Sequence, residues 1–324
     1  MKLIGSTGRE DLAVVYIAET SDGKAIEFVE ALQPPLPRSE KWVVIVSTLF
    51  GCPVKCSMCD AGHFYGGKLS KDEILAQIDF LVKKRYPDLQ VGSVKFKVQF
   101  ARMGDPAFNA SVLDVLDELP SRYDAPGLMP CLSTVAPRGT TSFFDRLLDI
   151  KKKLYKDRFQ LQFSLHTTDE SLRNRMIPVR KWTFGDIARY GERFFDEGGK
   201  KIALNFALDK DAPVEEAVLT QHFDPAHFII KITPLNPTYR AIQNRHESYL
   251  DPLRPSDGQG LVERLCATGY EIILSMGEAD ENHLGSNCGQ LVLNYISQAT
   301  SIPGAYSLAE PGLSATLSRP PRLK

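Results

Sequence analysis

The sequence has no apolar run long enough to cross a membrane, and its first residues lack the hydrophobic segment of a signal peptide. Its charges almost cancel, with a formal net charge of −1, which argues against a surface that binds phosphate over its whole extent. It has only 6 cysteines in 324 residues, and three lie in one short stretch rather than scattered as disulfide partners. We therefore expect a cytoplasmic, reduced, monomeric protein without a membrane segment.

The grouped cysteines predict an inorganic centre. Cys52, Cys56 and Cys59 have the spacing C-x3-C-x2-C, which brings three thiolates around one small object. Three sulfurs are one fewer than a closed structural zinc site or a fully ligated iron–sulfur cubane requires. A [4Fe–4S] cluster held here would keep one iron open for a cofactor. His63 follows Cys59 closely enough to complete a Cys3His zinc site, so zinc remains the alternative.

Strands and helices alternate along most of the chain. Residues 11–31 predict a β-hairpin around Ser21-Asp22-Gly23, and residues 42–47 a buried strand that leads into the cysteines. Further strands are expected over 94–100, 129–133, 159–165, 201–208, 228–232 and 271–275, with helices beginning at Ser70 and over 110–119, 142–154, 183–195, 214–222 and 262–267.

This alternation predicts an α/β fold, a partial (β/α)6-type TIM barrel with a small N-terminal β-hairpin extension. We expect residues 1–36 to form the extension, 37–297 the barrel and 298–324 a flexible C-terminal tail.

Polar residues follow the predicted strands where each strand ends. Gly104-Asp105-Pro106 comes after the strand over 94–100, Ser133 ends the next strand, and Ser164-Leu165-His166 ends the third. Asn236 follows the strand over 228–232. Active sites of parallel barrels lie at the C-terminal ends of the strands, so these residues and the cysteines are expected at one rim.

These motifs resemble the radical S-adenosylmethionine (SAM) RNA adenine methyl synthases, the RlmN/Cfr family, over residues 24–297. The resemblance implies that Cys52, Cys56 and Cys59 hold a [4Fe–4S] cluster. It further implies that SAM is bound by Gly104, Asp105, Ser133, Ser164, Leu165, His166 and Asn236. Asn287-Cys288-Gly289-Gln290-Leu291 resembles the family's C-terminal motif, so that Cys288 would carry the transferred carbon. Glu27 best matches the family's proton-accepting glutamate, and an exposed hairpin carboxylate is the alternative.

By the same resemblance, an electron from the cluster cleaves SAM to a 5′-deoxyadenosyl radical. One SAM methylates Cys288, and a second produces a radical on the S-methyl group, which adds to C2 of adenine in rRNA or tRNA. A reduced flavodoxin- or ferredoxin-type protein would donate the electron.

The sequence departs from the family in several places. Met58 replaces an aromatic residue, Asp105 a glutamate, and Ile45 stands where the family has a resolving cysteine. The residues before Cys52 predict a hairpin instead of a helical RNA-binding domain. A divergent radical SAM enzyme with a non-ribosomal substrate and a non-catalytic zinc-binding protein therefore remain alternatives.

Three further features need a structure to interpret them. The stretch 173–182 combines four cations with Trp182 directly after the His166 rim, which indicates contact with RNA phosphates and bases. Cys131 lies two residues before Ser133, and strand alternation places both on the inward face, where packing is the expected role of Cys131. Cys266, in a helix with Leu261, Val262 and Leu265, is expected to pack in the protein core.

Overall fold

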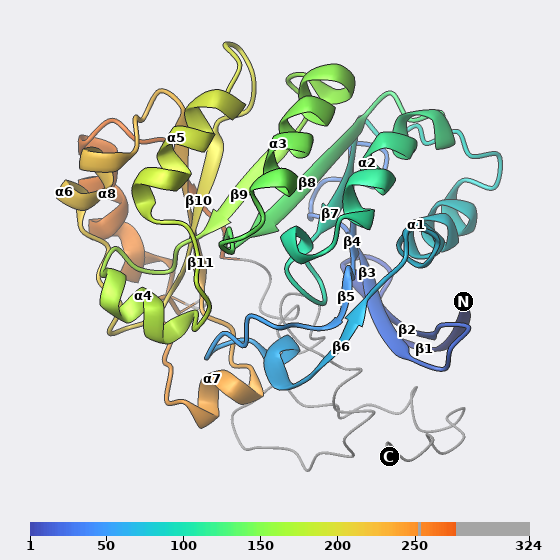
Figure 1. The fold of residues 1–324 in the computed structure, drawn as a ribbon, viewed down its shortest axis with the longest axis horizontal. Helices are drawn as coiled ribbons and strands as arrows, with labels where there is room; N and C mark the ends of the chain where they lie inside the picture. The colour runs from blue at the N-terminus through green and yellow to red at the C-terminus, as the bar shows by residue number, and fades with distance from the viewer. Residues whose placement is uncertain (252–253, 277–324) are drawn as a thin grey trace.

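The structure is a computed structural model and describes residues 1–251 and 254–276. Ten strands of this part of the chain form one sheet in chain order (Figure 1). They are β1 (Lys2–Arg9), β2 (Ala13–Glu19), β3 (Ala25–Ala31), β4 (Lys41–Val46), β7 (Lys95–Phe100), β8 (Leu128–Thr134), β9 (Gln160–Ser164), β10 (Ile202–Leu208), β11 (Phe228–Pro234) and β12 (Ile272–Leu274). From β4 to β12 all neighbouring strands are parallel.

Helices cover the outer face of the parallel strands, as Figure 1 shows for α1, α2, α3 and α5. The helices are α1 (Lys71–Arg85), α2 (Ser111–Arg122), α3 (Thr141–Ile150), α4 (Glu170–Met176), α5 (Phe184–Phe194), α6 (Glu216–His222), α7 (Tyr239–Gln243) and α8 (Gln259–Ala267). β4 and each strand from β7 to β11 are followed by a helix, and β12 adds one more parallel strand. The predicted partial (β/α)6-type barrel is therefore confirmed.

Local sequence signals explain several boundaries. Ser70 and Glu73 form the predicted capping box at the start of α1, in which each side chain binds the other residue's backbone N–H. Thr183 and Asp186 form a second capping box at α5. The helix predicted over 142–154 is α-helical only to Ile150, after which residues 151–155 form one π turn.

The N-terminal extension has one strand more than predicted. The hairpin over residues 11–31 is present as β2 and β3, and β1 pairs antiparallel with β2. β1 includes two glycines and is largely exposed, so it lacks the apolar alternation that indicates a strand. β3 pairs antiparallel with β4, which makes the extension continuous with the barrel sheet. The division of the chain at residues 36 and 297 remains a proposal, and the predicted tail lies outside the described residues.

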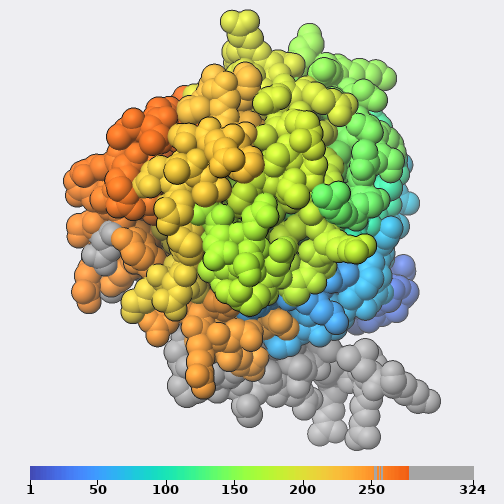
Figure 2. Space-filling model, turned by 60° about the vertical axis from the view of Figure 1, so that its left-hand side comes forward, coloured from blue at the N-terminus to red at the C-terminus, as the bar shows by residue number. Residues whose placement is uncertain are grey.

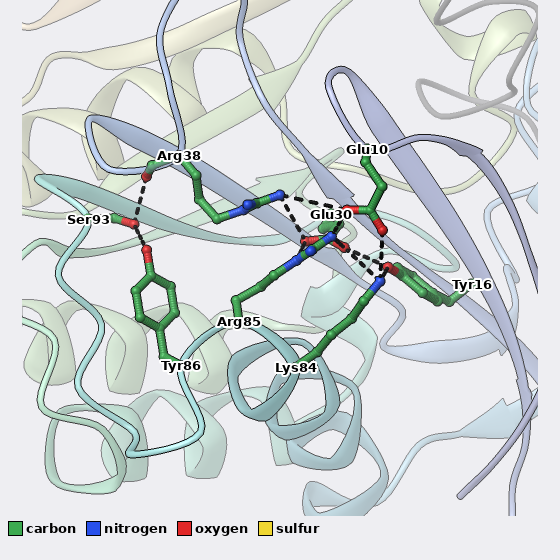
Figure 3. Close-up of polar contacts among 8 residues, drawn as sticks. All are labelled: Glu10, Tyr16, Glu30, Arg38, Lys84, Arg85, Tyr86 and Ser93. Atoms are coloured by element: carbon green, nitrogen blue, oxygen red, sulfur yellow. Dashed lines mark hydrogen bonds and ion pairs between the residues drawn. The ribbon is translucent and has the colours of Figure 1, made fainter.

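A buried carboxylate joins this extension to α1 (Figure 3). Glu30 on β3 is 3% exposed and accepts hydrogen bonds from Tyr16 Oη at 2.5 Å and from Arg85 Nη2 at 2.6 Å and Nε at 2.9 Å. Lys84 contributes an ion pair to Glu30 at 3.5 Å and donates to Tyr16 Oη at 2.6 Å. The extension is therefore fixed to the barrel by polar contacts as well as by the shared sheet.

Alternation along the parallel strands separates the helix-covered face from the barrel interior. On β8, Leu128 and Leu132 belong to the main apolar core together with residues of the helices. Cys131 and Ser133 therefore face the interior, as predicted, and Cys131 is 1% exposed. On β9 the same alternation turns Ser164 inward. Each helix in the described part of the chain is too short or too polar to span a membrane.

Candidate active site

The cysteine loop, residues 52–59, lies between two short strands that the sequence did not predict, β5 (Leu49–Gly51) and β6 (Tyr65–Lys68). These strands pair antiparallel, and the N–H of Cys52 donates to the carbonyl of Phe64 at 3.0 Å, so the pairing continues into the loop. Cys52, Cys56 and Cys59 all pack in one small apolar cluster, which also contains Met58. Met58 is 8% exposed and thus keeps the apolar character that the family's aromatic residue supplies.

The three thiols interact electrostatically. Burial raises the pKa of Cys52 to about 11, against the opposing effect of the backbone N–H groups of Val54, Asp105 and Lys55. The pKa of Cys56 lies well above its usual value because of burial and of negative charge on Cys59 and Cys52. Three thiolates gathered in an apolar setting fit a cationic centre, which would offset their repulsion. In residues 1–251 and 254–276, no three His, Cys, Asp or Glu side chains are arranged to hold a metal ion, so a centre bound by the three thiols would require their side chains to turn toward it.

The segment around α7 also binds the cysteine loop. Four successive loop carbonyls, those of Lys55, Cys56, Ser57 and Met58, accept hydrogen bonds from it. The donors are Arg240 Nη2 (3.5 Å) and Nε (3.2 Å), Asn244 Nδ2 (2.8 Å) and Thr238 Oγ1 (2.8 Å), respectively. Figures 1 and 2 show the two segments side by side, the loop in blue and the α7 segment in orange. Residues 238–246, here called the α7 clamp, thus hold the loop in place.

Sequence reasoning missed the α7 clamp. About 180 residues separate its side chains from the loop, so no local spacing joins them. One signal was available: the segment follows Asn236 at the end of a barrel strand and is rich in polar residues. The rule that functional polar residues gather at the C-terminal ends of the strands therefore also applies to the residues that follow Asn236.

Gly104-Asp105-Pro106 contacts the segment that leads into the cysteine loop, where Thr48 Oγ1 donates to the carbonyl of Gly104 at 3.3 Å. Gly104 has φ of +87°, and a Cβ there would lie 2.4 Å from the side chain of Leu49, so only glycine fits this turn. The N–H of Leu49 in β5 donates to the carbonyl of Met103, directly before this turn, at 3.0 Å. The Asp105 carboxylate, however, accepts bonds from the N–H of Val135 at 2.7 Å and from Thr134 Oγ1 at 2.8 Å.

This arrangement engages the Asp105 carboxylate within the protein, whereas the resemblance implies that Asp105 binds SAM. Burial raises the pKa of Asp105 to about 6, against the opposing effect of its N–H donors. One methylene shorter than glutamate, the side chain reaches the turn after β8 and fixes its conformation.

Two inward side chains at this rim have polar atoms without a partner among the described residues. Ser133 Oγ on β8 and Asn205 Oδ1 on β10 are buried and make no hydrogen bond. Asn205 lies opposite Ser164 of β9 in the sheet register. Unpaired buried polar atoms are rare in folded proteins, and here they leave donor and acceptor capacity for a polar ligand. Sequence reasoning identified Ser133 and Ser164 but not Asn205.

Leu165 and His166 have structural roles in this structure. Leu165 is 0% exposed and packs in the core on the helix side of the sheet. His166 Nδ1 accepts the N–H of Ala207 at 3.1 Å, and burial together with the charge of Arg173 lowers the pKa of His166 to about 4. His166 is therefore neutral at pH 7, and its Nδ1 already accepts a hydrogen bond from the backbone of the protein. Asn236 is partly buried at the end of β11, beside the α7 clamp.

Glu27 is not an exposed hairpin carboxylate. It is 0% exposed on β3 and pairs with Arg102 Nε at 2.7 Å. Its backbone carbonyl accepts Ser47 Oγ at 2.5 Å, and Ser47 Oγ in turn accepts the N–H of Met103 at 3.2 Å, directly before Gly104. Glu27 therefore lies next to the rim, while its predicted role as a proton acceptor stays a prediction.

The structure buries two of the four cations in the stretch that was expected to contact RNA, so that interpretation is wrong for Arg173 and Lys181 and stays a prediction for Arg175 and Arg180. Arg173 and Lys181 are 3% and 7% exposed and bind backbone carbonyls. Trp182 packs against Phe144, with ring centroids 4.3 Å apart. Their charges and ring serve the fold because α4 and the following loop turn them inward. Of this stretch, Arg175 and Arg180 are among the exposed residues.

The remaining residues with a role predicted from the sequence are Cys266, Cys288 and His63. Cys266 is exposed, contrary to expectation, because α8 buries Leu261 and Leu265 and turns the next position outward. Cys288 lies outside the described residues. The His63 side chain is 43% exposed and lies 4.0 Å from Asp60 Oδ1, which does not support a Cys3His zinc site.

Comparisons with known proteins show what the chain as a whole resembles. No family model matches the chain. The chain is 20% identical over 289 residues to the probable dual-specificity RNA methyltransferase RlmN of Petrotoga mobilis, covering 88% of this chain and 76% of that protein. It is 26% identical over 292 residues to the protein of the same name from Trichormus variabilis, with coverages of 87% and 73%.

A solved structure shows the same fold. A radical SAM methyltransferase from Sphaerobacter thermophilus superposes with a TM-score of 0.70 at 19% identity, covering 89% of this chain and 80% of that chain. The fold is therefore that of radical SAM enzymes. Within that class, the similarities confirm the predicted resemblance to the RlmN/Cfr-type enzymes and the prediction of a radical SAM methyltransferase.

Proposed function

We propose that this chain methylates adenine in RNA with SAM and a [4Fe–4S] cluster held by Cys52, Cys56 and Cys59. The observation that carries the proposal is the attachment of the Gly-Asp-Pro turn to the strand that leads into the cysteine loop: Thr48 Oγ1 donates to the carbonyl of Gly104 at 3.3 Å, and the N–H of Leu49 donates to the carbonyl of Met103 at 3.0 Å. When bound, the cluster supplies the electron that cleaves SAM.

We assign SAM binding and the positioning of the turn after β8 to other residues at the rim. Ser133 Oγ and Asn205 Oδ1 offer unpaired polar atoms to SAM, and Ser164 and Asn236 lie at neighbouring strand ends. We assign Asp105 to holding the turn that follows Ser133, through Thr134 and Val135, in addition to contact with SAM through its backbone. The apolar cluster around the cysteines excludes water from the reacting groups.

RNA as the substrate is supported by the names of the relatives, which are RNA methyltransferases. By resemblance, Cys288 accepts a methyl group from one SAM, and that carbon is later transferred to adenine C2. Ile45 packs among apolar residues of the extension, so no thiol stands at this position to resolve a covalent intermediate. A cytoplasmic monomer reduced by a flavodoxin- or ferredoxin-type protein completes the proposal.

A second candidate is a radical SAM enzyme that acts on a non-ribosomal substrate. The burial of Arg173 and Lys181 favours it, because this burial removes two of the four cations of the stretch from the surface that would contact a large RNA.

Anaerobic turnover with SAM, reduced flavodoxin and total RNA, followed by nucleoside mass spectrometry, tests the proposal. We expect methyladenosine in the RNA and an S-methyl mass increment on the peptide that contains Cys288. Cys56→Ala should abolish SAM cleavage, Cys288→Ala should abolish methylation, and Cys266→Ala, an exposed cysteine on α8, should behave as wild type. SAM cleavage without RNA methylation would favour the second candidate, and a protein that binds zinc and no cluster would refute both.

A further inference from the structure

Ser57, between the second and third cysteines, begins a chain of hydrogen bonds. Its Oγ lies 2.7 Å from His246 Nε2, and His246 Nδ1 lies 2.6 Å from Asp209 Oδ2. The three residues come from the cysteine loop, the end of the α7 clamp and the turn after β10. Neither His246 nor Asp209 belongs to the motifs that identified the site.

The direction of these bonds follows from the chemistry of the groups. A carboxylate only accepts hydrogen bonds, so Nδ1 of His246 carries a proton toward Asp209. In the neutral imidazole, Nε2 is then the acceptor, and the hydroxyl of Ser57 donates to it. Asp209 is 7% exposed, and its other oxygen accepts the N–H of Asp211 at 2.9 Å, so the carboxylate is itself fixed.

Every polar group of Ser57 is held by a different neighbour. Its N–H donates to the carbonyl of Met176 at 2.8 Å, and its carbonyl accepts from Asn244 Nδ2 at 2.8 Å. The position of the peptide between Cys56 and Cys59 is thus set from three sides. His246 is anchored as well, since its N–H donates to the carbonyl of Ala241 at 2.8 Å.

The same residue types form the catalytic triad of serine hydrolases, but the surroundings argue against that role. A serine nucleophile needs N–H donors aimed at the oxyanion, and its own N–H is a usual contributor. In this structure the N–H of Ser57 is taken by Met176. The chain of bonds therefore ends in the cysteine loop and serves its position.

We propose that Asp209 and His246 are positioning residues that fix Ser57 and thereby the geometry of Cys56 and Cys59. This inference rests on the proposed role of the cysteine loop as the cluster site. Partners behind the ligands of a metal centre orient those ligands, and their loss typically weakens metal binding or activity about 10–100-fold.

Loss of iron from the reconstituted protein tests the proposal. With a ferrous chelator in excess, we expect Ser57→Ala and His246→Ala to release iron about 10–100-fold faster than wild type. Ser57→Thr keeps the hydroxyl and should release iron at the wild-type rate. His222→Ala, on α6, is the matched control and should also match wild type. Wild-type retention of iron by Ser57→Ala would overturn the proposal.

A second measurement on iron-free protein separates this inference from the proposed function. Hydrogen exchange at the amide of Cys59, which donates to the Cys56 carbonyl at 3.2 Å, reports whether the loop is held. We expect exchange about tenfold faster in Ser57→Ala, with recovery in Ser57→Thr. If wild type assembles no cluster, the proposed function fails, while this exchange still decides the positioning role: unchanged exchange in Ser57→Ala refutes it.

Discussion

Glu27 and Arg102 form an ion pair in the interior, with Oε1 and Nε 2.7 Å apart and side chains 0% and 1% exposed. The pair joins β3 of the N-terminal extension to the segment that leads from β7 into Gly104-Asp105-Pro106. The extension therefore reaches the proposed active site through this contact as well as through the sheet.

Arg102→Met should destabilise the protein by about 3–5 kcal/mol, because it leaves the buried carboxylate of Glu27 without its counter-charge. Urea denaturation of iron-free protein measures the loss. The double variant Glu27→Gln/Arg102→Met removes both charges and should recover most of the stability. A single variant as stable as wild type would show that the pair contributes nothing.

The Glu30 network predicts a pH dependence of stability. Burial acts to raise the pKa of Glu30, but the hydrogen bonds from Arg85 and Tyr16 outweigh it, and the pKa is lowered. Ionised Glu30 therefore stabilises the fold above its unfolded pKa of about 4.5, and this contribution is lost as pH falls through the lower folded value.

Glu30→Gln should consequently lower the melting temperature at neutral pH, and its difference from wild type should shrink on acidification. Thermal unfolding between about pH 3 and 7 follows the convergence. The control is Glu40→Gln, at an exposed position on the connection between β3 and β4. Its melting temperature should depend on pH in the same way as that of wild type. A constant gap at all pH values would contradict the assigned role.

For lysines in the barrel interior, we expect removal of the charge to have the opposite effect on stability from removal of the Glu30 charge. Lys41 on β4 lies opposite Lys95 on β7 in register, and burial, followed by the charges of Lys95, Lys97 and Lys231, lowers the pKa of Lys41 to about 8. Between about pH 8 and 10.4, Lys41 therefore binds more protons in the unfolded chain than in the folded protein. Its contribution to the free energy of unfolding consequently rises with pH from about 8 to 10.4.

Lys41→Gln should therefore be more stable than wild type at pH 7, by roughly 1 kcal/mol, and should lose this advantage near pH 10.4. Urea denaturation at the two pH values measures both. Lys153→Gln, at an exposed position after α3, should show neither effect. Equal stability of Lys41→Gln and wild type at pH 7 would count against repulsion in the interior.

Asp60 links the cysteine loop to the start of α7. Its Oδ1 accepts the N–H of Arg240 at 2.9 Å, and its Oδ2 accepts the N–H of Tyr239 at 3.3 Å. Asp60→Ala should cost about 0.5–2 kcal/mol, as loss of a helix-capping side chain does. Hydrogen exchange at the Arg240 amide should rise, with Asp157→Ala as an exposed control. Unchanged protection at Arg240 would exclude the cap.

The sequence by itself determined the barrel and limited the kinds of centre that the three cysteines could hold. Apolar strands alternating with amphipathic helices permit few arrangements, and the cysteine spacing allows few chemistries, so both are local properties of the chain. Gly104 was also singled out from the sequence, by the Gly-Asp-Pro motif, and the structure supplies the reason for a glycine there: a positive φ and a close approach to Leu49.

Only the tertiary structure decided how the site is held and which charged residues belong to the core. The α7 clamp, the chain from Ser57 through His246 to Asp209, and the Glu27–Arg102 pair join segments far apart in sequence. The cationic stretch around Arg173 appeared to be a surface for RNA, yet the fold buries much of it. Hydrogen bonds and burial depend on distances between distant segments, and residue types along the chain do not encode those distances locally.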